Sequence, residues 1–129
     1  MTKGMKRRKS AAPAGTLLDR DAILALKGGR YEDVNALGGT VRVAAVSAGA
    51  RDAFELSLQD IPEKERRKDF RARLVVMSCI DEAGKPLFTV DDIPALSALD
   101  AAAIDPVVEV AMRINGLSQR DRDELEGNS

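Results

Sequence analysis

Residues 70–80, FRARLVVMSCI, begin with two arginines that alternate with apolar residues and end in an almost uninterrupted apolar run. Apolar residues recur there at steps of three and four, the spacing of one helical face: Phe70, Leu74, Met77 and Ile80. The end of the run is apolar nearly all round, so a buried strand also fits it, because periodicity cannot separate the two for a short apolar segment. The charged approach from Lys68 favours a buried central helix, and the rest of the chain is expected to pack around it.

Residues 47–62 predict a one-sided helix ahead of the central one. Ser47 suits the N-cap position, where a side-chain oxygen accepts from a backbone N–H of the first turn, and Pro62 ends the segment. The apolar positions between them follow helical spacing and are Ala50, Ala53, Phe54, Leu58 and Ile61.

Residues 31–46, YEDVNALGGTVRVAAV, have the pattern of two short strands. Val41 and Val43 flank Arg42, so one strand face is expected to be buried and the other to be wet. Gly38-Gly39 between the two runs predicts the turn of a β-hairpin.

Residues 17–29, LLDRDAILALKGG, predict a short helix before this hairpin, with Asp19 or Asp21 as its N-cap and Gly28-Gly29 as its end. The expected apolar stripe of this helix is Ile23, Leu24 and Leu26.

The C-terminal third predicts further capped helices. Thr89 stands three residues before Asp92, which is the spacing of a capping box with Asp in place of Glu. Asp105-Pro106 is expected to start a new helix, because proline is well tolerated at the first helical position, and Gly116 suits the left-handed residue after its end.

The last predicted helix is short and highly charged. Ser118 caps it, Asp121 occupies the capping-box position, and Leu117 and Leu125 are its only apolar anchors.

The predicted fold class is therefore α+β, mainly α: a small helical domain of about five or six helices with an N-terminal β-hairpin. Its 129 residues suit one core, so residues 19–129 are predicted to form a single domain. Three Phe, one Tyr and no Trp indicate an aliphatic core.

Charge divides the chain into a basic arm and an acidic body. Residues 1–18 carry five basic and no acidic residues, so the remainder carries a net −6, because the whole chain stands at −1. The arm has no apolar run and is predicted to be disordered. Neither a secretory signal nor a membrane span is predicted, and the expected location is intracellular.

The residue inventory argues against an enzyme. With no histidine and one cysteine, Cys79, the chain lacks the Cys/His sets of zinc sites and the His-activated nucleophiles. Cys79 lies in apolar surroundings and is predicted to be a core residue. Carboxylates gather at predicted helix starts and turns, where they suit capping better than metal binding or acid–base work: Asp81, Glu82, Asp91, Asp92, Asp121, Asp123, Glu124 and Glu126. No catalytic, metal or cofactor site is predicted.

Two stretches carry a resemblance to a known family: RARLVVMSCIDEAGKPLFT (71–89) and RINGLSQRDRDELEGN (113–128). These stretches, together with the hairpin and the 48–61 segment and in the same order along the chain, resemble the tail assembly chaperones of long-tailed bacteriophages and related prophages. The resemblance covers roughly residues 19–128, and none of its motifs is a catalytic signature.

The resemblance implies a non-enzymatic protein of the host cytoplasm that coats the tape measure protein, brings tail tube subunits to it, and is absent from the finished particle. In many relatives a ribosomal frameshift near the end of the gene adds a second domain, so the last helix is expected near that junction and only weakly anchored. Self-association is possible, and the basic arm is not associated with the family.

A tape measure protein is a long, apolar-faced helical chain, so its chaperone is expected to offer shallow apolar grooves. The partner-binding face is predicted at Phe54, Leu58, Ile61, Leu117 and Leu125. The simpler interpretation of Phe54 is a core residue. Two other functions stay open: a nucleic-acid-associated regulatory protein that uses the basic arm, although no aromatic interleaving supports it, or a structural tail or connector component.

Overall fold

The computed structural model describes residues 15–26 and 28–127 of the chain. Most of the predicted basic arm, residues 1–14, lies outside the described residues. The described chain is α+β and mainly α, as predicted, with six α-helices and one three-stranded sheet. In chain order the elements are α1 (Arg20–Leu24), β1 (Tyr31–Ala36), β2 (Gly39–Ala44), α2 (Ala48–Gln59), the short 3-10 helix η2 (Glu63–Glu65), α3 (Phe70–Ser78), β3 (Cys79–Ile80), the 3-10 helix η3 (Val90–Asp92), α4 (Ile93–Ser97), α5 (Ala101–Ile114) and α6 (Gln119–Leu125).

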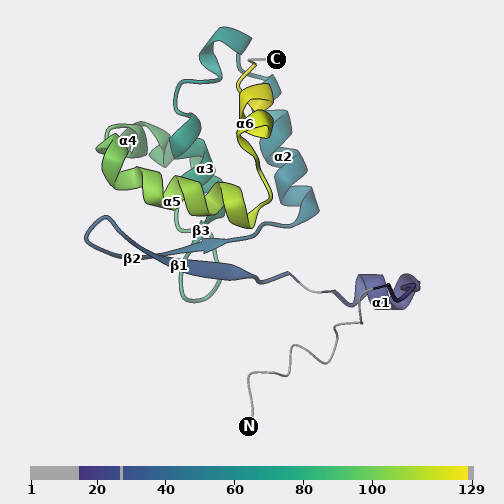
Figure 1. The fold of residues 1–129 in the computed structure, drawn as a ribbon. Coiled ribbons are helices and arrows are strands. Elements are labelled where there is room, and N and C mark those ends of the chain that lie inside the picture. The colour runs from purple at the N-terminus through teal and green to yellow at the C-terminus, as the bar shows by residue number, and fades with distance from the viewer. Residues whose placement is uncertain (1–14, 27, 128–129) are drawn as a thin grey trace.

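Helices cover one face of the sheet. Figure 1 shows α5 lying across the hairpin with α3 and α4 beside it, α2 and α6 next to each other at one end, and α1 apart from the rest. Burial alternates along β1, because its even-numbered residues face the helices and its odd-numbered residues face away. The core therefore lies between the sheet and the helices α3 and α5.

The hairpin forms as predicted, but its turn is shifted by one residue. Leu37 and Gly38 are the two loop residues, with φ angles of 56° and 81°, and Gly39 is already the first residue of β2. A two-residue hairpin loop of type I′ has left-handed backbone at both positions, which matches the twist of its strands. Leu37 adopts this conformation without being glycine, and the neighbouring Gly38 supplies the second position.

The central segment is both a helix and a strand. The helix predicted through Ile80 ends at Ser78, so the prediction was wrong for the last two residues, Cys79 and Ile80. Cys79 turns to extended backbone, with φ −81° and ψ 132°, and pairs with Val43 while Ile80 pairs with Arg42. A third strand thus joins the hairpin at the edge of β2, a choice between helix and strand that the segment's own periodicity could not make.

Helix α5 is longer than predicted. It begins at Ala101 and runs through Pro106 to Ile114, so the expected restart at Asp105-Pro106 was wrong. Proline within a helix removes one backbone hydrogen bond and often ends it. Here the helix continues because it buries a long one-sided stripe on the core: Ile104, Val107, Val108, Val110, Ala111 and Ile114.

Candidate partner-binding site

Helix α2 places two of the predicted contact residues on the core. Ser47 caps the helix, as predicted, because its Oγ accepts from the N–H of Ala50 at 3.1 Å. Phe54 and Leu58, four residues apart, are the buried residues of the helix. The Phe54 ring meets that of Phe70 edge-on, with centroids 6.3 Å apart. Each such buried side chain contributes about 1.5–3 kcal/mol, so α2 is held mainly by these two.

Helix α6 lies on the same cluster. Its predicted capping box is present: Ser118 accepts from the N–H of Asp121, and Asp121 accepts from the N–H of Ser118, which holds the pKa of that carboxyl below its usual range. The guanidinium carbon of Arg122 lies 5.1 Å from the ring centroid of Phe70. Arg122 also pairs with Glu126 at 3.2 Å, and that carboxylate is almost fully covered. The last helix is therefore held to the core by more contacts than the two leucines expected from the sequence.

Helices α2 and α6 run side by side (Figure 1). At their beginnings, Arg51 of α2 donates from Nη1 to the carbonyl oxygen of Asn115 at 2.9 Å. At their ends, Gly127 lies directly against the side chain of Glu63. These contacts tie the chain before α6 to α2 and the residue after α6 to the 3-10 helix η2.

The predicted partner-binding residues come together, but they are covered. Phe54, Leu58 and Leu117 are only 8%, 1% and 6% exposed, and belong to the core. Ile61 and Leu125 are half-buried and pack against it. The simpler interpretation of Phe54 as a core residue is confirmed. These five side chains do not form an open groove while α6 is in place.

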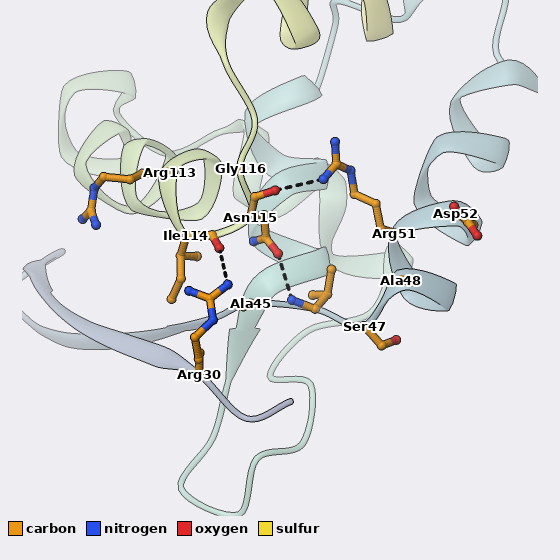
Figure 2. A pocket seen from close by; sticks show the side chains of 11 residues that line it. Arg30, Ala45, Ser47, Ala48, Arg51, Asp52, Arg113, Ile114, Asn115 and Gly116 are labelled. Atoms are coloured by element: carbon orange, nitrogen blue, oxygen red, sulfur yellow. Dashed lines mark hydrogen bonds between the residues drawn. The ribbon is translucent and has the colours of Figure 1, made fainter. Parts of the chain in front are cut away.

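Asn115 joins the segments from which α2 and α6 start (Figure 2). Its Nδ2 donates to the carbonyl oxygens of Ala44 and Ala111 at 3.2 and 2.9 Å. Its Oδ1 accepts from the N–H of Val46 at 2.8 Å. One half-buried amide thus fixes the end of β2, the end of α5 and the approach to α2 to one another.

Arginines complete this junction around a polar hollow of about 530 Å³. Arg30 donates to the carbonyl oxygen of Ile114 at 3.1 Å, as Arg51 does to that of Asn115 (Figure 2). The last carbonyls of α5 carry the negative end of the helix dipole, so both cations are well placed. Arg113 points away and pairs with Glu32 at 2.7 Å, and Arg51 also pairs with Glu55. Each of these arginines is therefore engaged in contacts that hold the fold together.

The sequence pattern missed the junction and the stacked arginine. Asn115 before Gly116 signals only a helix end, and the spacing of Arg122 and Glu126 signals only a local pair. Their partners in β2, α2 and α3 are distant in sequence, so no local pattern identifies them.

Asp81, Asp92 and the cysteine take the structural places that were predicted, whereas Glu126 is buried at the end of α6 and pairs with Arg122 there. Asp92 accepts from the N–H of Thr89 in a capping box, and Asp81 accepts from the N–H groups of Ala83 and Lys85 in a turn. Cys79 is buried, and burial raises the pKa of its thiol to about 11. Within residues 15–26 and 28–127, no three His, Cys, Asp or Glu residues gather as a metal site would require.

None of the helices in the described part of the chain is long and apolar enough to cross a membrane. Comparison with protein-family models, curated proteins and solved structures finds no match for this chain.

Proposed function

We propose that this chain is a phage tail assembly chaperone that holds helical, apolar-faced segments of a tape measure protein and helps to recruit tail tube subunits. The resemblance of residues 71–89 and 113–128 to that family supports the proposal. One structural observation supports it further: the five apolar residues expected to bind the partner all belong to the hydrophobic core or pack against it, and two of them, Leu117 and Leu125, come from the segment of α6. In this proposal the protein acts in the host cytoplasm, carries out no chemistry and is absent from the virion.

Helix α6 shows what kind of segment suits this apolar cluster. Leu117, just before its N-cap, and Leu125, its last residue, lie on the cluster, and the cation of Arg122 lies over Phe70 between them. A partner helix with apolar side chains at similar spacing would meet the same surface. No residue of Gln119–Leu125 is itself fully buried, so α6 can be displaced more easily than α3 or α5.

A disulfide that fixes α6 tests this mechanism. Glu63 of η2 and Gly127 are in direct contact, so the variant Glu63→Cys with Gly127→Cys should close a bond between η2 and the end of the α6 segment when oxidised. The native Cys79 is buried and should not compete. Cysteine at the Gly127 φ of 87° is strained in both forms, so the reduced form of the same variant is the matched control.

We expect the wild-type chain and the reduced variant to keep a tape measure protein soluble after its dilution from denaturant, and the oxidised variant to fail. If the oxidised variant works as well as the wild type, α6 does not need to move and the binding surface lies elsewhere. If the wild-type chain itself leaves the tape measure protein insoluble, the proposed function is wrong.

The basic arm supports a second candidate, a nucleic-acid-associated protein, because five cations within residues 1–18 suit phosphate contacts. In that case deletion of residues 1–15 should abolish retention on DNA or RNA and its salt dependence. A structural tail or connector component would instead be detected by mass spectrometry of purified virions, from which a chaperone is missing.

A further inference from the structure

Asn115 is followed directly by Gly116, and this is the one Asn-Gly pair in the sequence. The backbone nitrogen of the residue after an asparagine can attack the Cγ of the side-chain amide and displace ammonia. Glycine in that place favours the reaction, because it has no side chain to hinder the approach and leaves the backbone free to bend into a ring. The other asparagines, Asn35 and Asn128, are followed by alanine and serine. Asn115 is therefore the asparagine of this chain most prone to deamidation.

The folded chain holds this pair in a geometry that cannot react. Ring closure requires the Gly116 nitrogen to line up with the Cβ of Asn115 when viewed along the Cα–C bond. Asn115 has a ψ of 8°, so the Gly116 nitrogen is instead nearly eclipsed with the backbone nitrogen of Asn115 itself. The peptide plane between the two residues would have to rotate through a large angle before the ring could close.

Hydrogen bonds hold both reacting groups in place. On the peptide plane, Arg51 donates to the Asn115 carbonyl oxygen at 2.9 Å (Figure 2), and the Gly116 N–H donates to the carbonyl oxygen of Arg113 at 3.1 Å. The side-chain amide is held by its three hydrogen bonds to backbone groups of β2, α5 and the segment before α2. Both residues line the polar hollow of about 530 Å³, so water has access to the pair. Geometry, rather than a lack of water, thus prevents the reaction.

We propose that Asn115–Gly116 is a deamidation site that the folded junction protects and that an opening of the junction exposes. In the open state the Gly116 nitrogen bonds to Cγ of Asn115, and the side-chain nitrogen leaves as ammonia, taking the proton from Gly116. Water then opens the resulting succinimide at either of its two carbonyl carbons. Opening at Cγ gives aspartate, and opening at the backbone carbonyl gives isoaspartate, in which the main chain runs through Cβ and Cγ.

Either product breaks the junction permanently. Aspartate can still accept from the N–H of Val46, but it cannot donate to the carbonyl oxygens of Ala44 and Ala111, and it places negative charge beside them. Isoaspartate also lengthens the main chain by one carbon between α5 and α6. A chain that has opened and reacted therefore cannot restore the contacts of Asn115, so the pair is an irreversible chemical record of opening.

Peptide mapping by mass spectrometry, after digestion at acidic pH, measures the reaction at each asparagine during incubation at pH 8. In guanidinium chloride we expect Asn115 to react much faster than Asn35. In the folded chain Asn115 should react at least about tenfold more slowly than in denaturant, because it waits for an opening that costs about 1.4 kcal/mol for each tenfold. Equal rates for Asn115 in the folded and unfolded chain overturn the proposal. Equal rates for Asn115 and Asn35 in denaturant also overturn it.

The variant Arg51→Ala tests the hold on the peptide plane. It removes the donor to the Asn115 carbonyl oxygen and should raise the reaction rate in the folded chain by about tenfold. Glu55→Gln is the matched control, because it removes the ion pair of Arg51 at 3.0 Å and leaves that hydrogen bond, so it should react like the wild type. Circular dichroism checks that both variants fold. Equal rates for Arg51→Ala and the wild type would contradict the protection by this contact.

The variant Asn115→Asp reproduces one of the two products. We expect faster hydrogen exchange from the end of β2 to the first turn of α2, and in α6, than in the wild type. Asn35→Asp is the control, because it adds the same charge at an exposed position of β1 and should exchange like the wild type. If Asn115→Asp also exchanges like the wild type, deamidation does not break the junction and the proposal is wrong.

Discussion

Arg122 of α6 lies over the ring of Phe70, the first residue of α3, with its guanidinium carbon 5.1 Å from the ring centroid. The same ring meets Phe54 of α2 edge-on. Three helices thus meet at one aromatic side chain that is only 1% exposed. Because α6 has few apolar anchors, this stacked cation is a main link between it and the core.

Substitution Arg122→Ala should loosen α6 without unfolding the domain. It removes the cation over Phe70 and leaves Glu126, which is 6% exposed, without its partner. We expect a loss of about 1–2 kcal/mol in the stability of α6. Hydrogen exchange should show faster exchange in residues 119–126, while α3 and α5 keep their protection.

The matched control is Arg120→Ala in the same helix. Arg120 and Glu124 form an ion pair of the same spacing, but their side chains are 88% and 55% exposed. Exposed pairs contribute little, so this variant should exchange like the wild type. Equal effects of the two substitutions would contradict the stabilising role of the stacked cation.

Local sequence patterns predicted the parts of the fold that depend on contacts between residues close together in the sequence. The caps at Ser47, at Thr89 and at Ser118 are all present, because each joins a side chain to a backbone group within three residues. The hairpin and the one-sided face of α5 also follow from spacing that the sequence displays directly.

Contacts between residues distant in sequence determined the parts of the fold that the sequence pattern could not predict. Cys79 and Ile80 form a strand because β2 offers a free edge there. The helix ends and the strand begins at a point where the residues fit both the helical and the strand pattern. Likewise, α1 shows helical spacing, yet the body offers its apolar face no neighbour. Phe54 and Leu58 lie on one face of α2, as predicted, but the side chain that Phe54 meets, Phe70, is distant in sequence.

Asn115→Ala should destabilise the whole domain. The amide satisfies two carbonyl oxygens and one N–H from three segments, and alanine would leave these half-buried groups unpaired. We expect a loss of about 1–3 kcal/mol in the free energy of unfolding, measured in urea. The control Asn35→Ala removes an exposed amide in β1, whose contact with Thr40 is long at 3.4 Å, and should change little. Similar losses in both variants would contradict the proposed junction.

Leu37→Asn should stabilise the hairpin. Leu37 has a φ of 56° and is 48% exposed, so asparagine relieves left-handed strain while losing little packing. The midpoint of thermal unfolding should rise, with a gain of up to about 1 kcal/mol. Gly38→Ala places a Cβ at a φ of 81° and should lower the midpoint instead. A fall in the midpoint for Leu37→Asn would mean that the Leu37 side chain packs better than its exposure indicates.

Cys79 should resist thiol reagents until the chain unfolds. The residue is 1% exposed, and burial raises the pKa of its thiol from near 9 to about 11. At pH 8 both effects suppress the thiolate that reacts, so labelling with a thiol reagent should follow the unfolding curve in denaturant. Fast labelling of the native chain would show that β3 opens without global unfolding.

The same pKa shift makes stability fall in alkali. The unfolded thiol ionises near pH 9, while the folded thiol holds its proton to about pH 11. Stability from this group is therefore complete below pH 9 and declines as pH rises toward 11, by an amount on the order of 2 kcal/mol. Cys79→Ala removes this component, although it also loses some packing. The slope of unfolding free energy against pH between 9 and 11 should be shallower in the variant. Equal slopes would mean that the thiol ionises alike in both states.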